Sequence, residues 1–417
     1  MKDNKILILG GKPISSCDIV NYAKFQGAFT VVTDYLPASQ SPAKRIADEA
    51  WDISTSEVEL LCNKIKDNHI NAVFTGVHEY NIDKVIKICQ SLSLPFYASF
   101  EAYAKLSNKE IYKQLFKDAG LPAIKEYYKG RAIDFHYSDC SYPLIVKPVD
   151  GSSGVGVKIC SKEEELRLSV ALAGEASNVG HVIVEEYMDA PELTIFYIAR
   201  NGKILLSAMA DRETQHFCKG VIPLPVMYRF PSVHLRDYES RFNKKVISVL
   251  SEIGVCDGMV FMQAFWRNGD VYIYDVGYRL TGTQEYNLLS YICGYNPLEM
   301  MVDYAMTGKM GNQDIEKLVD PYLNGKFAGI VTCLMMPGTI KEFVGVHEIE
   351  HTDGVIKFLL NHEVGETVSM DRLGTLGQIV ARAFVVVDEK DQLEFVRKKV
   401  LSSLKVIDVN GNDLLIR

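Results

Sequence analysis

The first hundred residues alternate between short apolar runs and stretches in which apolar positions recur with helical spacing. The apolar runs lie at 5–9, 29–33, 72–74 and 95–98, and the helical stretches at 14–27, 58–68 and 81–92. A short apolar run between turn residues is typical of a buried strand, and strands that alternate with helices form parallel sheets. The pattern therefore predicts a doubly wound parallel sheet at the start of the chain.

Two glycines and an acid in this segment permit a second interpretation. Gly10-Gly11 follows the first expected strand, and Asp34 ends the second, where an acid often holds a ribose. The residues after Gly11 are Lys12-Pro13-Ile14, so the third glycine of a dinucleotide signature is missing. We expect ordinary turn chemistry here and keep an NAD-dependent oxidoreductase as an alternative.

The run at 106–119 has the pattern of an amphipathic helix, with Ser107 or Asn108 as its expected N-cap. Lys109 falls in the first turn of this helix. The helix dipole disfavours a cation there, so we expect another group to hold Lys109 in place. The alternative is a solvated lysine.

The segment 142–160 contains a strand that ends at Lys147, a loop of glycines and serines, and a second strand. Gly151, Gly154 and Gly156 allow the loop to bring backbone amides close to anionic oxygens, and Lys147 adds a positive charge. The GxxxxGK[ST] order of a P-loop is absent, and the loop leads into a strand instead of a helix. We therefore expect a hairpin that closes over phosphates as a lid.

Two acids interrupt the next expected strand, at 182–188. Glu185-Glu186 lie between apolar Val184 and Tyr187, and a break at 190–192 precedes a further strand at 193–199. Adjacent acids at a strand end are usually solvated. If the edge is buried, it offers backbone groups to a flat purine.

A hairpin is predicted at 259–282, with Asn268-Gly269 as its two-residue turn. It places Gln263 and Asp275 side by side on neighbouring strands, with Arg279 just beyond. An amide oxygen, a carboxylate and a counter-charge are the groups that a magnesium-bound polyphosphate requires. The alternative is an ordinary sheet hairpin with a solvated acid.

From about residue 320 the pattern changes to short strands between glycines, at 327–334 and 355–360, with a helix near 389–402. We expect a small α+β unit there. The predicted division is an N-terminal α/β domain at 1–104, a lid subdomain with its linker helix at 105–190, a catalytic subdomain at 191–319 and the C-terminal unit at 320–417.

Composition excludes several classes of protein. The 417 residues carry a formal net charge of -8, so no blanket basic field favours nucleic acid. The apolar run near the start is too short for a secretory signal or a membrane span, and we expect a cytoplasmic protein without a membrane partner. The nine cysteines are scattered without a CxxC pair and are expected to be reduced packing residues.

Four of these motifs together resemble the ATP-grasp superfamily. They are Lys109, the VKP-x-DGSSGVGV segment from Val146, the VEEYMDAPE segment, and the paired QAF…YDVGYR strands. Each motif is weak alone, but all four occur in the family's order and approximate spacing. The resemblance spans residues 5 to about 308 and includes an N-terminal domain like those of carbamoyl-phosphate synthetase halves, biotin carboxylase and purine-pathway ligases. The C-terminal part resembles that of L-amino-acid ligases.

The resemblance implies a role for each motif. Two lysines, Lys109 and Lys147, are expected to hold the ATP phosphates, and the lid loop to close over the γ-phosphate and exclude water. The loop residues implied are Gly151, Ser152, Ser153, Gly154 and Gly156. The adenine and ribose contacts implied are Glu185 at the amino group, the backbone of Glu186 and Met188 at the adenine edge, and Glu192 at the ribose hydroxyls.

The metal and catalytic residues also follow from the resemblance. Gln263 and Asp275 match the ligands of Mg²⁺, with Mn²⁺ as the alternative ion, and Arg279 matches the arginine that steadies the transferring phosphoryl group. This chain departs from the family twice. Asp275 replaces the usual glutamate, and Gly277 replaces an asparagine two residues further on. We therefore expect fewer or weaker bound ions, unless ATP or a nearby acid such as Asp211 completes the set.

The implied chemistry is carboxylate activation through an acyl phosphate, followed by attack of an amine and release of ADP and phosphate. We expect small-molecule substrates, with an amino acid as donor or acceptor, and a homodimer. The candidate substrate residues are Glu79, His216, Lys219 and Thr281. The alternative is a nucleotide-binding sensor or degenerate scaffold with little turnover, which the departures at Asp275 and Gly277 favour.

Overall fold

The computed structural model describes residues 4–137, 140–150, 156–217 and 222–417. Its N-terminal domain is a parallel sheet in the order β3-β2-β1-β4. The strands are β1 (Lys5–Leu9), β2 (Phe29–Thr33), β3 (Glu49–Trp51) and β4 (Ala72–Phe74). The helices are α1 (Ile14–Phe25), η1 (Ala38–Gln40), α2 (Pro42–Ile46), α3 (Val58–Asp67) and α4 (Glu79–Leu92). The predicted doubly wound parallel sheet is confirmed.

The strand expected at 95–98 is absent, and that prediction is wrong. Pro95 has no N–H to donate to a neighbouring strand. Tyr97 and Ala98 are buried by packing instead, and the Tyr97 hydroxyl donates to the carbonyl of Tyr278 at 3.0 Å. The segment therefore packs the N-terminal domain against the end of the predicted hairpin at 259–282, and it joins neither sheet.

The expected helix at 106–119 is two helices, α5 (Phe100–Ser107) and α6 (Lys109–Asp118). They are separated at Asn108, whose extended backbone breaks the helix and whose side chain accepts hydrogen bonds from the backbone N–H groups of Glu110 and Ile111. Asn108 is thus the N-cap, one of the two residues predicted. It places Lys109 at the first position of α6.

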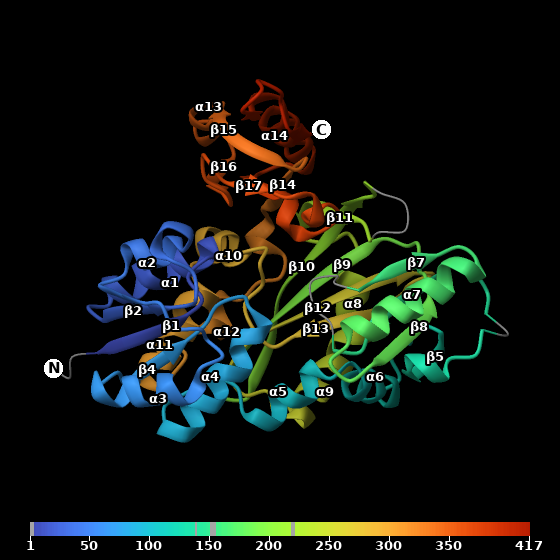
Figure 1. Ribbon diagram of the computed structural model, residues 1–417, viewed down its shortest axis with the longest axis horizontal. Helices are drawn as coiled ribbons and strands as arrows, with labels where there is room; N and C mark the ends of the chain where they lie inside the picture. The colour runs from blue at the N-terminus through green and yellow to red at the C-terminus, as the bar shows by residue number, and fades with distance from the viewer. Residues whose placement is uncertain (1–3, 138–139, 151–155, 218–221) are drawn as a thin grey trace.

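The lid subdomain is a four-stranded antiparallel sheet in the order β5-β8-β6-β7, with one long helix beside it (Figure 1). Its elements are β5 (Glu126–Arg131), η2 (Ala132–Asp134), β6 (Leu144–Pro148), β7 (Lys158–Cys160), α7 (Glu163–Ala176) and β8 (His181–Glu186). Strand β6 ends next to Lys147, as the sequence predicted. The N-terminal domain and the lid lie at opposite ends of the catalytic sheet (Figure 1).

A nine-stranded sheet forms the centre of the molecule, with the path β13-β12-β9-β10-β11-β14-β18-β16 and β20 paired to β14. The strands before residue 320 are β9 (Glu192–Arg200), β10 (Lys203–Gln215), β11 (Leu224–Phe230), β12 (Gly258–Arg267) and β13 (Asp270–Gly277). The helices of this part are α8 (Leu235–Tyr238), η3 (Glu239–Asn243), α9 (Lys244–Ile253), α10 (Tyr286–Cys293), α11 (Pro297–Thr307) and α12 (Ile315–Leu318).

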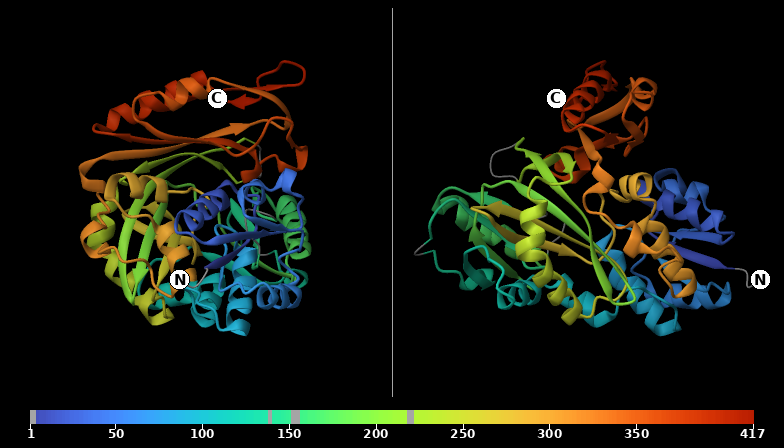
Figure 2. Two further views of the ribbon diagram at one scale, coloured as in Figure 1. Left: turned by 90° about the vertical axis from the view of Figure 1, so that its left-hand side faces the viewer. Right: turned by 180° about the vertical axis from the view of Figure 1, so that it is seen from behind.

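The C-terminal unit continues this sheet through β14, which pairs with β11. Its strands are β14 (Phe327–Met335), β15 (Gly338–Val344), β16 (Val355–Leu360), β17 (Thr367–Val368), β18 (Ile379–Val387), β19 (Lys405–Asp408) and β20 (Leu415–Ile416). Its helices are η4 (Leu323–Gly325), α13 (Val346–Glu350), η5 (Met370–Arg372), η6 (Leu376–Gln378) and α14 (Lys390–Ser403). Both views of Figure 2 place this unit above the rest of the chain. Hydrogen bonds thus cross the predicted boundary at 320.

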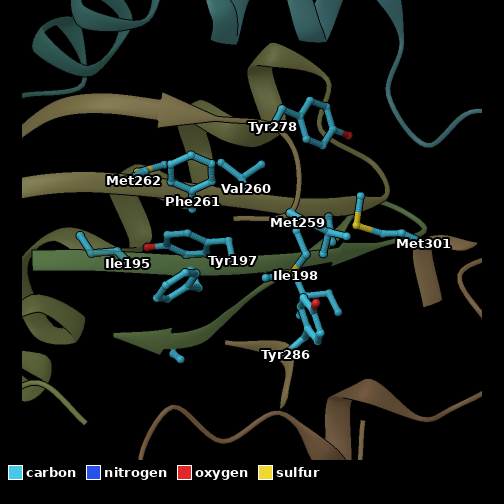
Figure 3. Packing of buried hydrophobic residues seen from close by; sticks show 14 of the residues in the cluster. Ile195, Tyr197, Ile198, Met259, Val260, Phe261, Met262, Tyr278, Tyr286 and Met301 are labelled. Carbon is cyan, nitrogen blue, oxygen red and sulfur yellow. The ribbon is translucent and has the colours of Figure 1, made fainter. Parts of the chain in front are cut away.

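The main core lies where β9 and β12 meet the surrounding helices. Figure 3 shows Tyr197 and Ile198 of β9 beside Met259 and Phe261 of β12, with Met301 of α11 close by. This apolar packing fixes the hairpin that carries Gln263 and Asp275. None of the helices described is both long enough and apolar enough to cross a bilayer.

Candidate active site

The predicted hairpin is present and pairs Gln263 of β12 with Asp275 of β13. Asn268 and Gly269 both have positive φ, as a type I′ turn requires. The register shifts immediately after Gln263, which indicates a bulge in the ladder. A bulge changes the direction of neighbouring side chains. This one lies beside Gln263 and Asp275, whose oxygens would have to converge on a metal ion.

The same face of the sheet continues into β9 and β10. Gln263 also pairs with Thr194, and Glu192, two residues earlier on β9, pairs with Arg212 of β10. The Glu192 carboxylate accepts hydrogen bonds from the Arg212 guanidinium and, at 2.7 Å, from the Tyr274 hydroxyl. The expected ribose ligand is therefore held in a largely buried ion pair. Arg212 was not singled out from the sequence.

Cations gather around Asp275. Burial raises the pKa of the Asp275 carboxyl, and the negative charge of Glu79 adds to that rise. The nearby charges of Lys109, Arg279 and Lys147 oppose it. Three residues from α6, from β6 and from beyond β13 thus lie within electrostatic range of one carboxylate. The sequence motifs that carry Lys109, Lys147, Asp275 and Arg279 are brought to one place.

Arg279 lies against the N-terminal domain. Its Nε is 2.6 Å from Oε2 of Glu79, and its guanidinium stands over the Phe261 ring at 4.9 Å. The other Glu79 oxygen accepts a hydrogen bond from the Tyr103 hydroxyl at 2.7 Å. Glu79, a candidate substrate residue, is the first residue of α4 and contacts Arg279, the predicted catalytic arginine.

Gly277 has a close neighbour at the position where the family resemblance leads us to expect an asparagine. A Cβ at Gly277 would lie 2.2 Å from Cε1 of Phe261, its register partner on β12. The aromatic ring therefore occupies the space of the missing side chain. The two positions are sterically matched, which leaves Gln263 and Asp275 as the predicted ligand pair.

Glu185 is buried between two lysines. Its Oε2 lies 2.5 Å from Nζ of Lys147, and its Oε1 pairs with Lys113 of α6. The two cations hold the pKa of Glu185 below its usual range despite burial. Burial together with Lys147 lowers the pKa of Lys113 to about 8. The sequence analysis missed Lys113, although its place one helical turn after Lys109 puts both on one face of α6.

The segment after Glu185 is the one predicted to present backbone groups to adenine. Glu186 donates its N–H to the Lys125 carbonyl at 2.9 Å, and its carboxylate pairs with Arg267 at 2.5 Å. Met188 is buried, and its N–H makes no hydrogen bond within the described part of the chain. That N–H remains a donor for an adenine edge.

One residue of the predicted lid loop is described. Gly156 has φ +73, and a Cβ there would meet Pro148 at 2.8 Å, so the position requires glycine. The other predicted loop residues, Gly151, Ser152, Ser153 and Gly154, lie outside the described residues, as does Lys219.

Thr281 and Thr283 follow Arg279 and share one carboxylate. Both hydroxyls lie within hydrogen-bond range of Oε2 of Glu285, which is fully buried. Burial raises the pKa of Glu285. Its second oxygen, Oε1, has no partner among the described residues. Thr281 thus forms a hydrogen bond with a buried carboxylate of the same chain. The contact expected between Thr281 and a substrate stays a prediction.

His216 and Asp211 lie apart from the predicted metal pair. Nε2 of the exposed His216 is 3.3 Å from the Tyr187 hydroxyl, which places it beside the segment predicted to contact adenine. The Asp211 carboxylate accepts hydrogen bonds from the Ser232 hydroxyl and the Val233 N–H. These contacts tie Asp211 to the β11–α8 connection. Its neighbour Arg212 points to the opposite face of β10.

The glycines of the N-terminal domain serve local structure. Asp34 accepts hydrogen bonds from the Gly11 N–H and the Ser41 hydroxyl, both at 2.8 Å, and pairs with buried Lys44 at 3.0 Å. Its carboxylate is engaged inside the domain, which supports the expected turn chemistry over a ribose site.

Within residues 4–137, 140–150, 156–217 and 222–417, no three His, Cys, Asp or Glu side chains cluster closely enough to hold a metal. The predicted pair has one carboxylate and one amide, a weaker set of hard oxygen donors. Such a pair fits a metal ion that a polyphosphate itself helps to coordinate.

Comparison with known proteins gives partial matches in sequence. The family described as D-ala D-ala ligase C-terminus matches residues 95–221. D-alanine–D-alanine ligase of Staphylococcus epidermidis is 29% identical over 157 residues, which cover 34% of this chain and 43% of that protein. A formate-dependent phosphoribosylglycinamide formyltransferase of Prochlorococcus marinus is 25% identical over 204 residues, 48% of this chain and 51% of that protein. The chain thus spans about half the length of these curated relatives.

Solved structures match over almost the whole chain. L-amino acid ligase from Bacillus licheniformis superposes with a TM-score of 0.78 at 16% identity, covering 98% of this chain and 99% of that one. Phosphoribosylglycinamide synthetase from Anaerococcus prevotii gives a TM-score of 0.72 at 17% identity, covering 97% and 99%. The resemblance predicted from the motifs is confirmed, and the chain has the ATP-grasp fold.

Proposed function

We propose that this protein is an ATP-dependent ligase that joins a carboxylate to an amine and releases ADP and phosphate. One observation carries the proposal: Lys109, Lys147 and Arg279 lie within electrostatic range of Asp275, which stands opposite Gln263. Cations beside a pair of metal ligands stabilise the negative charge that develops on the phosphate oxygens during phosphoryl transfer. The ligase names of the relatives agree with this chemistry.

ATP binds between the lid sheet and the hairpin in this proposal. Lys109 and Lys147 hold the phosphates. The Met188 N–H addresses the adenine edge. Glu192, already oriented by Arg212, takes the ribose hydroxyls.

Glu185 has a different role from the one the family resemblance suggested. Its carboxylate neutralises Lys113 and shares Lys147, so we assign it to orienting the phosphate-binding lysine. A lysine held in place by a buried carboxylate loses less rotational freedom when phosphate binds.

Gln263 and Asp275 would hold Mg²⁺, with Mn²⁺ as the alternative ion. When bound, the metal neutralises charge on the phosphate oxygens. Arg279 steadies the transferring phosphoryl group, and Glu79 fixes the direction of that guanidinium. The substrate carboxylate attacks the γ-phosphate, and an amine then displaces phosphate from the acyl phosphate.

The L-amino acid ligase that matches over nearly the full chain suggests amino acids as substrates. Purified protein is incubated with ATP, Mg²⁺ and pairs of amino acids, and the nucleotide products are separated by chromatography. ADP and phosphate in an amount that depends on the amino acids support the proposal. AMP and pyrophosphate contradict the acyl-phosphate route.

A nucleotide-binding sensor is the second candidate, and the matched pair of Gly277 and Phe261 favours it because it removes a metal ligand. Tight ATP binding in calorimetry, without acceptor-dependent turnover over a broad panel of carboxylates and amines, would select this function.

We further propose a cytoplasmic homodimer that binds neither nucleic acid nor membrane. Light scattering coupled to gel filtration tests the dimer. A monomer at micromolar concentration would contradict it.

A further inference from the structure

Arg382 is a buried cation without a partner. It lies in the middle of β18 with 9% of its surface exposed, and its Nε is buried without a hydrogen bond. Across the residues that the structure describes, its guanidinium makes no hydrogen bond and no ion pair. Burying a charge without compensation costs several kcal/mol, and a guanidinium does not escape this cost by losing its proton. A group of this kind indicates a missing anion.

Thr332 lies directly beside Arg382. The two residues are register partners on β14 and β18. Thr332 is 3% exposed, and its hydroxyl is also buried without a partner. Unpaired buried polar atoms are uncommon, and here two of them share one rung of the sheet. A guanidinium and a hydroxyl together offer the donors that an oxyanion accepts.

Another cation on this face of the sheet is already neutralised. Lys357 of β16 shares the sheet face of Arg382, and its Nζ lies 3.3 Å from Oδ1 of Asp18 and 2.9 Å from Oδ1 of Asn287. The other Asp18 oxygen accepts a hydrogen bond from Tyr286 at 2.8 Å. Asp18 is therefore engaged by Lys357 and Tyr286, and the charge of Arg382 remains in excess.

Tyr286 connects this cluster to the candidate active site. It begins α10, directly after Glu285, whose carboxylate binds the Thr281 and Thr283 hydroxyls. Glu285 and Arg382 both act on the pKa of Tyr286, in opposite directions. The start of α10 thus lies next to the loop after Arg279 on one side and next to β18 on the other. In Figure 1, α10 lies beneath the C-terminal unit.

We propose that Arg382 and Thr332 bind an oxyanion, a carboxylate or a phosphate, of the acceptor substrate. The guanidinium takes two oxygens and the Thr332 hydroxyl donates to one of them. That the ligand is the acceptor rests on the proposed function. The presence of an anion site does not.

The sign of a stability change separates this proposal from a structural role. Arg382→Met keeps the length of the side chain and removes the uncompensated charge. If Arg382 serves a ligand, the variant without ligand melts at the same temperature as the wild type or higher. If Arg382 holds the fold together, the variant melts lower.

Binding is measured by thermal unfolding with sodium acetate or sodium phosphate against sodium chloride at equal ionic strength. A saturating non-hydrolysable ATP analogue with Mg²⁺ occupies the nucleotide site. The wild type is expected to gain roughly 2 °C at an anion concentration about ten times its Kd, and Arg382→Met to gain nothing. A response to acetate alone indicates a carboxylate, and a response to phosphate alone indicates a phosphate.

Arg229→Met is the matched control, because Arg229 lies on β11 in the same sheet but is paired with Glu213 and Glu394. It should melt lower and keep the anion response. No anion response in the wild type, or an equal response in Arg382→Met, overturns the proposal.

Turnover gives an independent measurement. Arg382→Met is expected to raise the KM for an anionic acceptor by about tenfold to a hundredfold, the loss of one or two charge-assisted hydrogen bonds, while the KM for ATP stays unchanged. If the proposed ligase function is wrong, none of the proteins releases ADP, but the melting difference still decides whether the anion site exists.

Discussion

The substitution Asp275→Asn tests the predicted metal site most directly. It removes the single carboxylate of the Gln263–Asp275 pair and keeps the size of the side chain. Asparagine leaves no cavity, so packing around β13 is preserved. What changes is the negative charge, which would balance that of Mg²⁺ and of the cations around Asp275.

The expected loss falls on catalysis more than on binding. Metal neutralisation of transition-state charge contributes several kcal/mol, so kcat should fall on the order of a thousandfold, or about 4 kcal/mol. Lys109 and Lys147 still hold the phosphates. The Kd for ATP should therefore rise by only about tenfold, or about 1.4 kcal/mol.

Stability should move in the opposite direction from activity. Burial raises the pKa of Asp275 in the folded protein. A carboxyl with a raised folded pKa destabilises the fold above its unfolded pKa, because the unfolded state carries the charge more readily. At neutral pH the variant should therefore melt at the wild-type temperature or higher in the absence of ligand.

The measurements are single-turnover ADP formation, calorimetric titration with ATP and Mg²⁺, and thermal unfolding. Asp270→Asn is the control, because Asp270 lies in the same hairpin but in an exposed pair with Arg241 at 2.8 Å. It should leave all three unchanged. Wild-type turnover in Asp275→Asn would refute the assignment of the hairpin as the metal site.

Three further outcomes follow from the site. The pKa of Lys113 is lowered to about 8 in the folded protein, so the unfolded chain binds more protons between about pH 8 and pH 10.5 and the wild type becomes more stable as the pH rises. Lys113→Met should remove this rise in melting temperature. Gly277→Asn should destabilise by about 1–3 kcal/mol in urea unfolding because its side chain meets Phe261, and adding Phe261→Ala should recover part of that loss, whereas no change in the single variant would contradict the packing argument. Glu79→Gln should weaken the hold on Arg279 and lower kcat about tenfold with an unchanged KM for ATP, and an unchanged kcat would mean that Glu79 does not position Arg279.

The sequence predicted elements with strong local signals. The strand at Lys5–Leu9 and the turn at Asn268-Gly269 are present because a buried apolar run and two residues that tolerate positive φ determine them locally. The Asn108 cap is also local. The strand expected at 95–98 failed because tertiary packing of Tyr97 outweighed the apolar pattern.

The site was predictable only as separate motifs. Periodicity placed Gln263 and Asp275 on one hairpin, but the two-residue turn alone would pair Gln263 with Tyr274. The bulge after Gln263 shifts the register by one residue and brings Asp275 opposite Gln263. The pairing of Lys113 with Glu185 joins α6 to β8, and that of Arg212 with Glu192 joins two strands. Partners that lie far apart in sequence leave no spacing signal, so these ion pairs emerge only from the fold.

Asp275 and Arg382 are both ionisable side chains whose charged form is disfavoured by burial, one an acid and the other a base. Burial raises the pKa of Asp275 and lowers that of Arg382, so burial disfavours the charged form of each side chain. Residues retained only for stability would have been replaced by apolar ones at such positions. A bound ligand of opposite charge removes the cost, which makes binding stronger than the same contacts would be in a relaxed site.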